Sequence, residues 1–83
     1  MWRLKPGQTL TYRSWDDEYV VYNDLSGDTH LFGTDPMQLL LQLRTGPASE
    51  EALALALDVM PDERELMAVM LTELRGLSLI ERI

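Results

Sequence analysis

Residues 18–32, EYVVYNDLSGDTHLF, decide how the rest of the chain can fold. The segment YVVY at 19–22 is entirely β-branched or aromatic, which suits a pleated and partly buried strand. THLF at 29–32 is a second short segment of this kind, and Gly27 lies in a polar loop between the two. The stretch therefore predicts a β-hairpin, and this hairpin must carry the sheet because the chain beyond it has helical patterning.

One more strand is predicted before the hairpin, so that the three strands form an antiparallel meander near Gln8–Trp15, Glu18–Asn23 and Asp28–Phe32. Met1–Pro6 is predicted as an extended lead-in, and Leu77–Ile83 as a short strand or an extended tail. Three strands followed by three helices is an α+β order. We expect a small winged-helix-like domain with a three-stranded antiparallel sheet followed by three helices.

Capping residues mark the three helices. Asp35 is the predicted N-cap of the first, ahead of Pro36, and the second is capped by Ser49. The predicted ranges are Asp35–Thr45, Ser49–Asp58 and Asp62–Arg75. Leu40 of the first helix and Met70 of the third are expected in the core.

The third predicted helix is apolar over a wider arc than packing on one side requires. Its arc covers about 200°, whereas a helix packed on one side needs roughly 100°. We therefore expect something beyond the core to contact it, either a bound peptide or a second copy of the chain. Trp2 and Trp15 can likewise be binding aromatics or can pack the first strand. The central stripe of this helix is predicted as Leu66, Met67, Met70 and Leu74, flanked by Val69 and Leu71.

Size and composition are those of one domain spanning residues 1–83. A chain of 83 residues buries roughly 60% of its unfolded surface, which leaves little room for a deep active site. The absence of cysteine excludes disulfides, thiolate metal sites and a cysteine nucleophile. No apolar run is long enough to span a bilayer, and no signal-peptide pattern opens the chain. We expect a soluble, cytoplasmic protein without a membrane partner.

The formal net charge is −7 and is unevenly distributed. Residues 1–15 contain three bases and no acid, and residues 16–35 contain six acids and no Lys or Arg. The third predicted helix, which would read DNA in a winged helix, carries four acids and two arginines over residues 62–75. Phosphate binding needs clustered Lys and Arg. Nucleic acid is therefore not an expected partner.

No group of residues in the sequence has the spacing of a catalytic or metal-binding site. His30, the one histidine, could bind a metal ion together with Asp24 and Asp28. A structural zinc site, however, has four protein ligands, commonly thiolate or imidazole. Ser26 is the only serine near that histidine, and its position in the loop favours turn chemistry over nucleophilic catalysis. We expect His30 to be a cross-strand side chain, and the protein to be no enzyme and to hold no metal or cofactor.

The chain resembles the PqqD-like proteins, also described as RiPP recognition elements, over nearly its whole length. The resemblance lies in the strand pair YVVYN and GDTHLF, the helix start TDP, the junction GPAS and the closing LRGL. The segments WRL at 2–4 and YRSWDDEY at 12–19 more narrowly resemble the small PqqD-type protein of HPr-kinase-related gene cassettes.

This resemblance implies a peptide chaperone. Such proteins bind the leader segment of a ribosomally made precursor peptide and present it to a modifying enzyme, here a peptide-modifying or HPr-kinase-related one. The leader adds as a strand beside the third strand and lies against the third helix, which is β-augmentation. The alternative is a homodimeric structural or regulatory protein that pairs through the same surface. The implied peptide-binding residues are Asp28, Thr29, His30, Leu31, Phe32, Met67, Val69, Met70 and Leu71.

Overall fold

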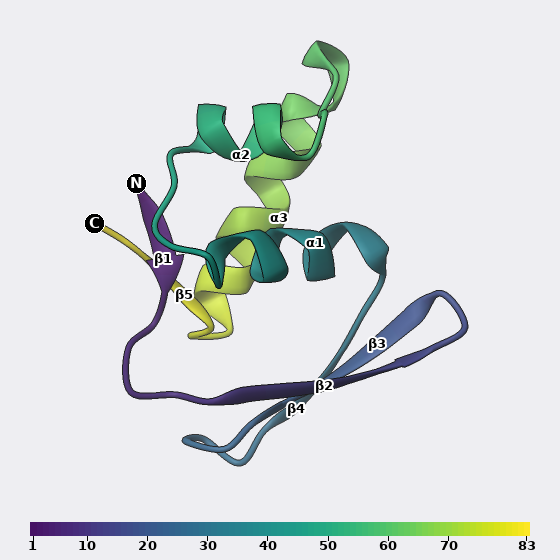
Figure 1. The fold of residues 1–83 in the computed structure, drawn as a ribbon, viewed down its shortest axis with the longest axis vertical. Helices are drawn as coiled ribbons and strands as arrows, with labels where there is room; N and C mark the ends of the chain where they lie inside the picture. The colour runs from purple at the N-terminus through teal and green to yellow at the C-terminus, as the bar shows by residue number, and fades with distance from the viewer.

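Five strands and three α-helices make up the protein, which the computed structural model describes over residues 1–83 (Figure 1). The strands form two separate antiparallel sheets, so the α+β class is confirmed. In chain order the elements are β1 (Trp2–Leu4), β2 (Leu10–Trp15), β3 (Glu18–Asn23), β4 (Thr29–Phe32), α1 (Thr34–Leu43), α2 (Glu50–Ala56), the 3₁₀ turn η1 (Pro61–Glu63), α3 (Arg64–Gly76) and β5 (Ile80–Arg82).

The larger sheet is the predicted meander, with strand order β2-β3-β4. Its register pairs Trp15 with Glu18 at the end of the first hairpin and Tyr19 with Phe32 in the second. β2 begins two residues later than predicted, at Leu10, and β4 one residue later. The hairpin prediction from residues 18–32 is confirmed.

The loop between β3 and β4 sets the register of the second hairpin. The Asn23 N–H donates to the Asp28 carbonyl at 2.9 Å, and the Gly27 N–H donates to the Asn23 carbonyl at 2.8 Å. Gly27 is thus the extra residue of a bulge, and its φ of 76° is one that glycine adopts without steric cost. Asn23 is buried, and its side-chain amide donates to Gln8 Oε1 at 2.8 Å. These bonds determine which backbone groups of β4 face outward.

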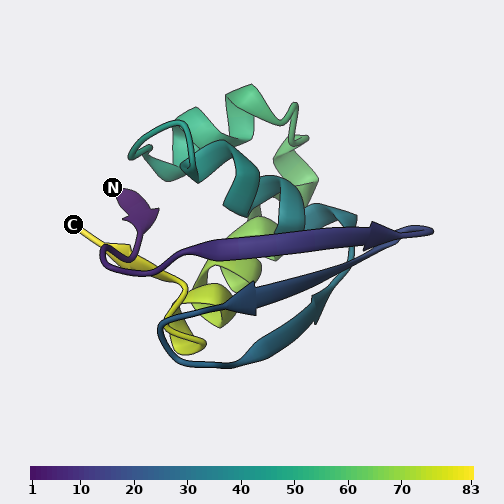
Figure 2. The same cartoon turned by 60° about the horizontal axis from the view of Figure 1, so that its bottom comes forward.

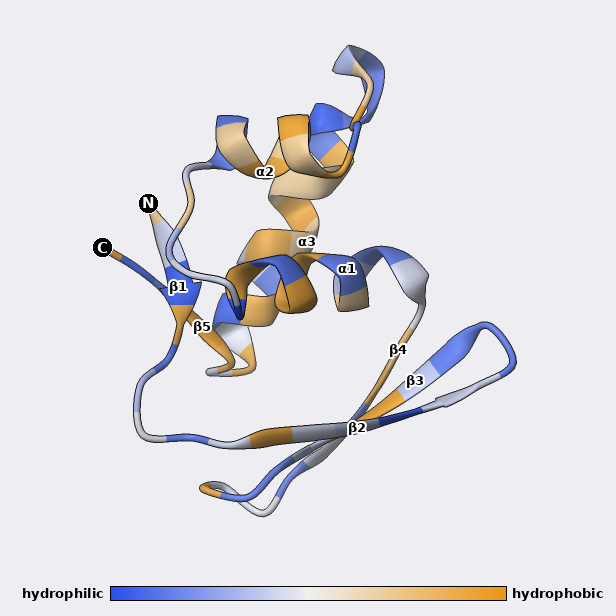
Figure 3. Cartoon of the chain, viewed as in Figure 1, coloured by the Kyte–Doolittle hydropathy of each residue, from blue (hydrophilic) through white to orange (hydrophobic).

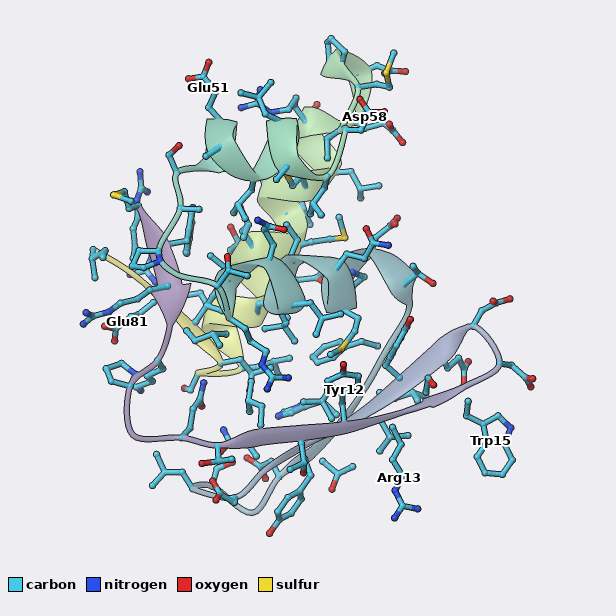
Figure 4. The ribbon with its side chains drawn as sticks, in the orientation of Figure 1. Tyr12, Arg13, Trp15, Glu51, Asp58 and Glu81 are labelled. Atoms are coloured by element: carbon cyan, nitrogen blue, oxygen red, sulfur yellow. The ribbon has the colours of Figure 1, made fainter.

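The helices cover one face of the larger sheet, and the other face is open (Figure 2). Tyr12 points toward the helices, whereas Arg13 and Trp15 point away from them (Figure 4). Val21 is fully buried on the inner face. Trp15 is 76% exposed, so it does not pack the first strand of the sheet. The alternation of the strands therefore leaves an open outer face.

The smaller sheet joins the two ends of the chain, and the sequence does not predict this pairing. β1 and β5 run antiparallel, with Trp2 opposite Arg82 and Leu4 opposite Ile80. Trp2 is buried and exchanges two backbone hydrogen bonds with Ala48, at 2.8 and 2.9 Å. The predicted lead-in and tail are therefore strands of one sheet. Trp2 is a packing residue.

The helix starts follow local rules, with one correction. Ser49 caps α2 as predicted, since its Oγ accepts from the Ala52 N–H at 3.0 Å. The predicted N-cap of α1, Asp35, is wrong: Gly33 occupies that position without a side-chain hydrogen bond. Asp35 lies instead in the first turn, where the helix dipole favours an acid. Before α3, the Met60 N–H donates to the Glu63 carboxylate at 3.3 Å.

The core lies between the helices and the inner face of the sheet, and α3 contributes Met67, Leu71 and Leu74. This face is rotated by about 50° from the predicted stripe, at 3.6 residues per turn. Leu66 is 57% exposed, so its placement at the centre of that stripe is wrong. Met70 packs against the core but is only half-buried, whereas Leu40 is fully buried as predicted. Both α1 and α2 pack against α3, and together they determine which face it buries.

Hydrophobic residues are concentrated on the three helices, and the far end of the β2–β3 hairpin is hydrophilic (Figure 3). None of the helices has the length and apolarity that crossing a membrane requires. Exposed large apolar side chains occur both on the larger sheet, as at Trp15 and Leu31, and on α3, as at Leu66.

Two leucines of α3 provide a matched test of this packing. Leu71→Ala should lower the free energy of unfolding by about 2–5 kcal/mol, because it opens a cavity at a side chain with no exposed surface. Leu66→Ala should change it by less than about 1 kcal/mol. Leu40→Ala should behave like the Leu71 variant, and Met70→Ala should fall between the two. Urea unfolding measures all four, and equal losses at Leu66 and Leu71 would contradict the observed helical face.

Candidate functional site

β4 is an edge strand, because it pairs with β3 on one side and with nothing on the other. Bonded and non-bonded pairs alternate in an antiparallel ladder. The Asn23–Asp28 pair is hydrogen-bonded, so the next bonded residues of β4 are His30 and Phe32, opposite Val21 and Tyr19 of β3. The peptide groups of Thr29 and Leu31 therefore point away from β3. A free edge with unpaired N–H and C=O groups is a template for another extended chain.

The side chains of β4 alternate between the two faces of the sheet. Leu31 is 63% exposed on the outer face, and Thr29 is exposed beside it. His30 and Phe32 are half-buried on the inner face, where their rings stack at a centroid distance of 5.8 Å. The Nε2 atom of His30 is buried without a hydrogen-bond partner. The predicted cross-strand role of His30 is thus confirmed, opposite Val21.

The helical half of the predicted site needs a correction. Met67 and Leu71 belong to the core and are not part of the exposed surface of α3. Val69 is exposed, and Met70 is half-buried. The exposed apolar residues of the α3 segment instead follow the next stripe around the helix, which contains Leu66, Val69 and Leu77 with Met70 at its inner border.

A cavity of about 120 Å³ lies between the start of α1, the α2–α3 connection and α3. Its apolar lining consists of Leu39, Leu57, Val59, Leu66, Met67 and Met70. Met67 and Met70 are the only predicted site residues that line it, and the residues of β4 do not. The strand and helix halves of the predicted site therefore do not share one cavity. Among the helices, α1 is the one that packs closely against β4.

The rim of this cavity is acidic. Asp35, Asp58 and Glu63 line it, and no Lys or Arg does. The only ion pair in the structure joins Arg3 and Glu81, which lie on the paired terminal strands. The three rim carboxylates are therefore not neutralised by a basic side chain of the protein.

The residues considered for catalysis or metal binding have other roles. Ser26 Oγ accepts a hydrogen bond from the Asp28 N–H at 3.2 Å, which is turn chemistry. Asp24 accepts one from the Thr9 N–H at 2.9 Å, and His30 faces the inner side of the sheet. No three His, Asp or Glu side chains are grouped so that they could hold a metal ion.

Sequence reasoning misses Leu57, Asp58 and Val59, because they lie in a connection between helices and carry no recognisable motif. Asp58 takes a left-handed φ of 55°, which is favoured for Asp and Asn among the non-glycine residues. No family model, curated protein or solved structure matches the chain.

Amide hydrogen exchange tests the free edge without any ligand. The amides of His30 and Phe32 should be protected, because they bond to β3, whereas those of Thr29 and Leu31 should exchange rapidly. Protection of all four in dilute solution would contradict a free edge. It would then favour pairing of β4 with a second copy of the chain.

Proposed function

We propose that this protein is a peptide-binding module of the PqqD type. It takes up an extended segment, the leader of a ribosomally made precursor peptide, as an additional strand beside β4. The observation that carries the proposal is the unpaired edge of β4, with the peptide groups of Thr29 and Leu31 directed outward. Main-chain bonds along this edge supply affinity, and neighbouring apolar surface supplies specificity.

We also propose that the domain has a winged-helix-like fold. The three-stranded antiparallel sheet precedes three helices, and the β2–β3 hairpin extends beyond the body in the way that a wing does (Figure 1). DNA binding, the other common use of such folds, is disfavoured because α3 and the preceding η1 turn are predominantly acidic.

Side-chain recognition follows from the geometry of an added strand. Only every second residue of the peptide faces the domain, so its apolar residues should alternate. The exposed stripe of Leu66, Val69 and Leu77, which borders Met70, offers apolar surface to these side chains of the peptide. The net charge of −7 favours peptides that carry Lys or Arg, mainly through a faster association rate.

A leader that is disordered before binding loses conformational entropy when it docks, which limits its affinity. Modest affinity suits a protein that must pass the peptide on to an enzyme. We place this enzyme among peptide-modifying or HPr-kinase-related proteins, and the pair in the cytoplasm.

Peptides selected from a displayed library of random 15-residue sequences provide the test. They should carry alternating apolar residues, and a selected peptide should shift the amides of Thr29–Phe32 and of residues 66–77. Leu31→Pro should weaken binding at least tenfold, because it removes an outward donor at an edge position where proline is tolerated. Leu31→Ala is the matched control: it keeps that donor and should weaken binding less.

Retained protection of the His30 and Phe32 amides shows that the proline variant is folded. Equal binding by the proline and alanine variants would overturn strand addition. A dimer joined through β4 would also be sensitive to Leu31→Pro, but sedimentation would detect it without peptide, and the added peptide would dissociate it.

A further inference from the structure

The cavity beside α3 combines an apolar floor with three acidic residues at its mouth. We propose that it holds one aliphatic side chain of a peptide whose neighbouring residue is Lys or Arg. The inference rests on the proposed function, since the peptide is the one that pairs with β4. It adds an anchoring site in the α1, α2–α3 and α3 region, outside the strand edge.

The size of the cavity selects the occupant. Its volume of about 120 Å³ is below the several hundred Å³ that cofactors and drug-sized ligands require. An apolar protein cavity of roughly 150 Å³ accepts benzene. A leucine, isoleucine or methionine side chain is of this scale. The flexible thioethers of Met67 and Met70 can adjust the cavity to such a group.

Local bonds hold the acidic rim in place. The Asp58 N–H donates to the Leu55 carbonyl at 3.4 Å, and the Val59 N–H donates to the Ala54 carbonyl at 2.8 Å. The carboxylate of Glu63 is held by the Met60 N–H. These bonds position the backbone of Asp58 and the carboxylate of Glu63 at the rim.

No base of the protein competes for this rim. Arg64, the nearest basic residue in sequence to Glu63, lines a different hollow together with Glu50 and Glu51. Anionic ligands such as phosphates would meet three carboxylates and no cation. A cationic side chain next to the buried aliphatic one is the complementary arrangement.

The cavity is within reach of a peptide on the edge strand. Asp35 of the rim lies three residues after Phe32, the last residue of β4. Three residues of extended chain span at most about 11 Å. A peptide that runs along β4 past Phe32 therefore needs only a short continuation to place a side chain in the cavity.

Three capped tripeptides serve as probes: acetyl-Lys-Leu-Lys-amide, acetyl-Lys-Ser-Lys-amide and acetyl-Glu-Leu-Glu-amide. Protein labelled with ¹³C at its methionine methyl groups reports their binding. Met70 and Met67 line the cavity, and the internal controls are Met1 and Met37, which do not. Saturable shifts of the Met70 methyl are expected with the first tripeptide, and they should weaken as salt is added.

Asp58→Asn keeps a residue that accepts the left-handed backbone and should raise the Kd of the first tripeptide roughly two- to fivefold, the range of a partly exposed ion pair. Asp17→Asn removes an exposed acid in the turn between β2 and β3, outside the cavity lining, and should leave this Kd unchanged. The proposal is overturned if the Met70 methyl does not shift, or if it shifts equally with either control tripeptide.

The outcome separates this inference from the proposed function. Selected peptides that shift the β4 amides, combined with no tripeptide effect at Met70, would overturn the anchoring site alone. A tripeptide effect at Met70, combined with unshifted β4 amides for every selected peptide, would leave the cavity as a side-chain site and overturn strand addition.

Discussion

Burial of one face of α3 is the constraint on which the rest of the structure depends. Met67, Leu71 and Leu74 are almost completely removed from solvent, and α1, α2 and β5 all pack against this helix. A domain of this size has few fully buried side chains, and their burial must offset the conformational entropy lost on folding. The sheet is attached to this helical core mainly through α1, which contacts both β3 and β4.

This constraint also determines which surfaces remain for recognition. Leu71 and Leu74 hold α3 in place and are closed to solvent, so the exposed apolar surface of this helix is the neighbouring stripe with Leu66 and Val69. The same packing leaves β4 without a partner on its outer side and leaves a small cavity where the α2–α3 connection passes α1. The edge strand and the cavity both adjoin α1, the helix that links the sheet to the core.

The β3–β4 hairpin is predictable from sequence because its signals are local, as at the bulge residue Gly27. The β1–β5 pair is not, since three-residue strands show no periodicity and the bonded Arg3 and Glu81 are 78 residues apart. The buried face of α3 is predicted only approximately. Leu66 and Leu71 are chemically identical, and tertiary packing alone distinguishes them. The strand half of the site is predictable, whereas the cavity depends on Asp58 in an irregular connection.

Strand addition to β4 is the central claim, and contacts between backbone protons test it most directly. In a complex with a selected peptide, nuclear Overhauser effects should connect the amide protons of Thr29 and Leu31 with backbone protons of the peptide, at the spacing of paired strands. Contacts of the peptide with α3 or with the outer face of the sheet alone, without any to the backbone of β4, would contradict the claim.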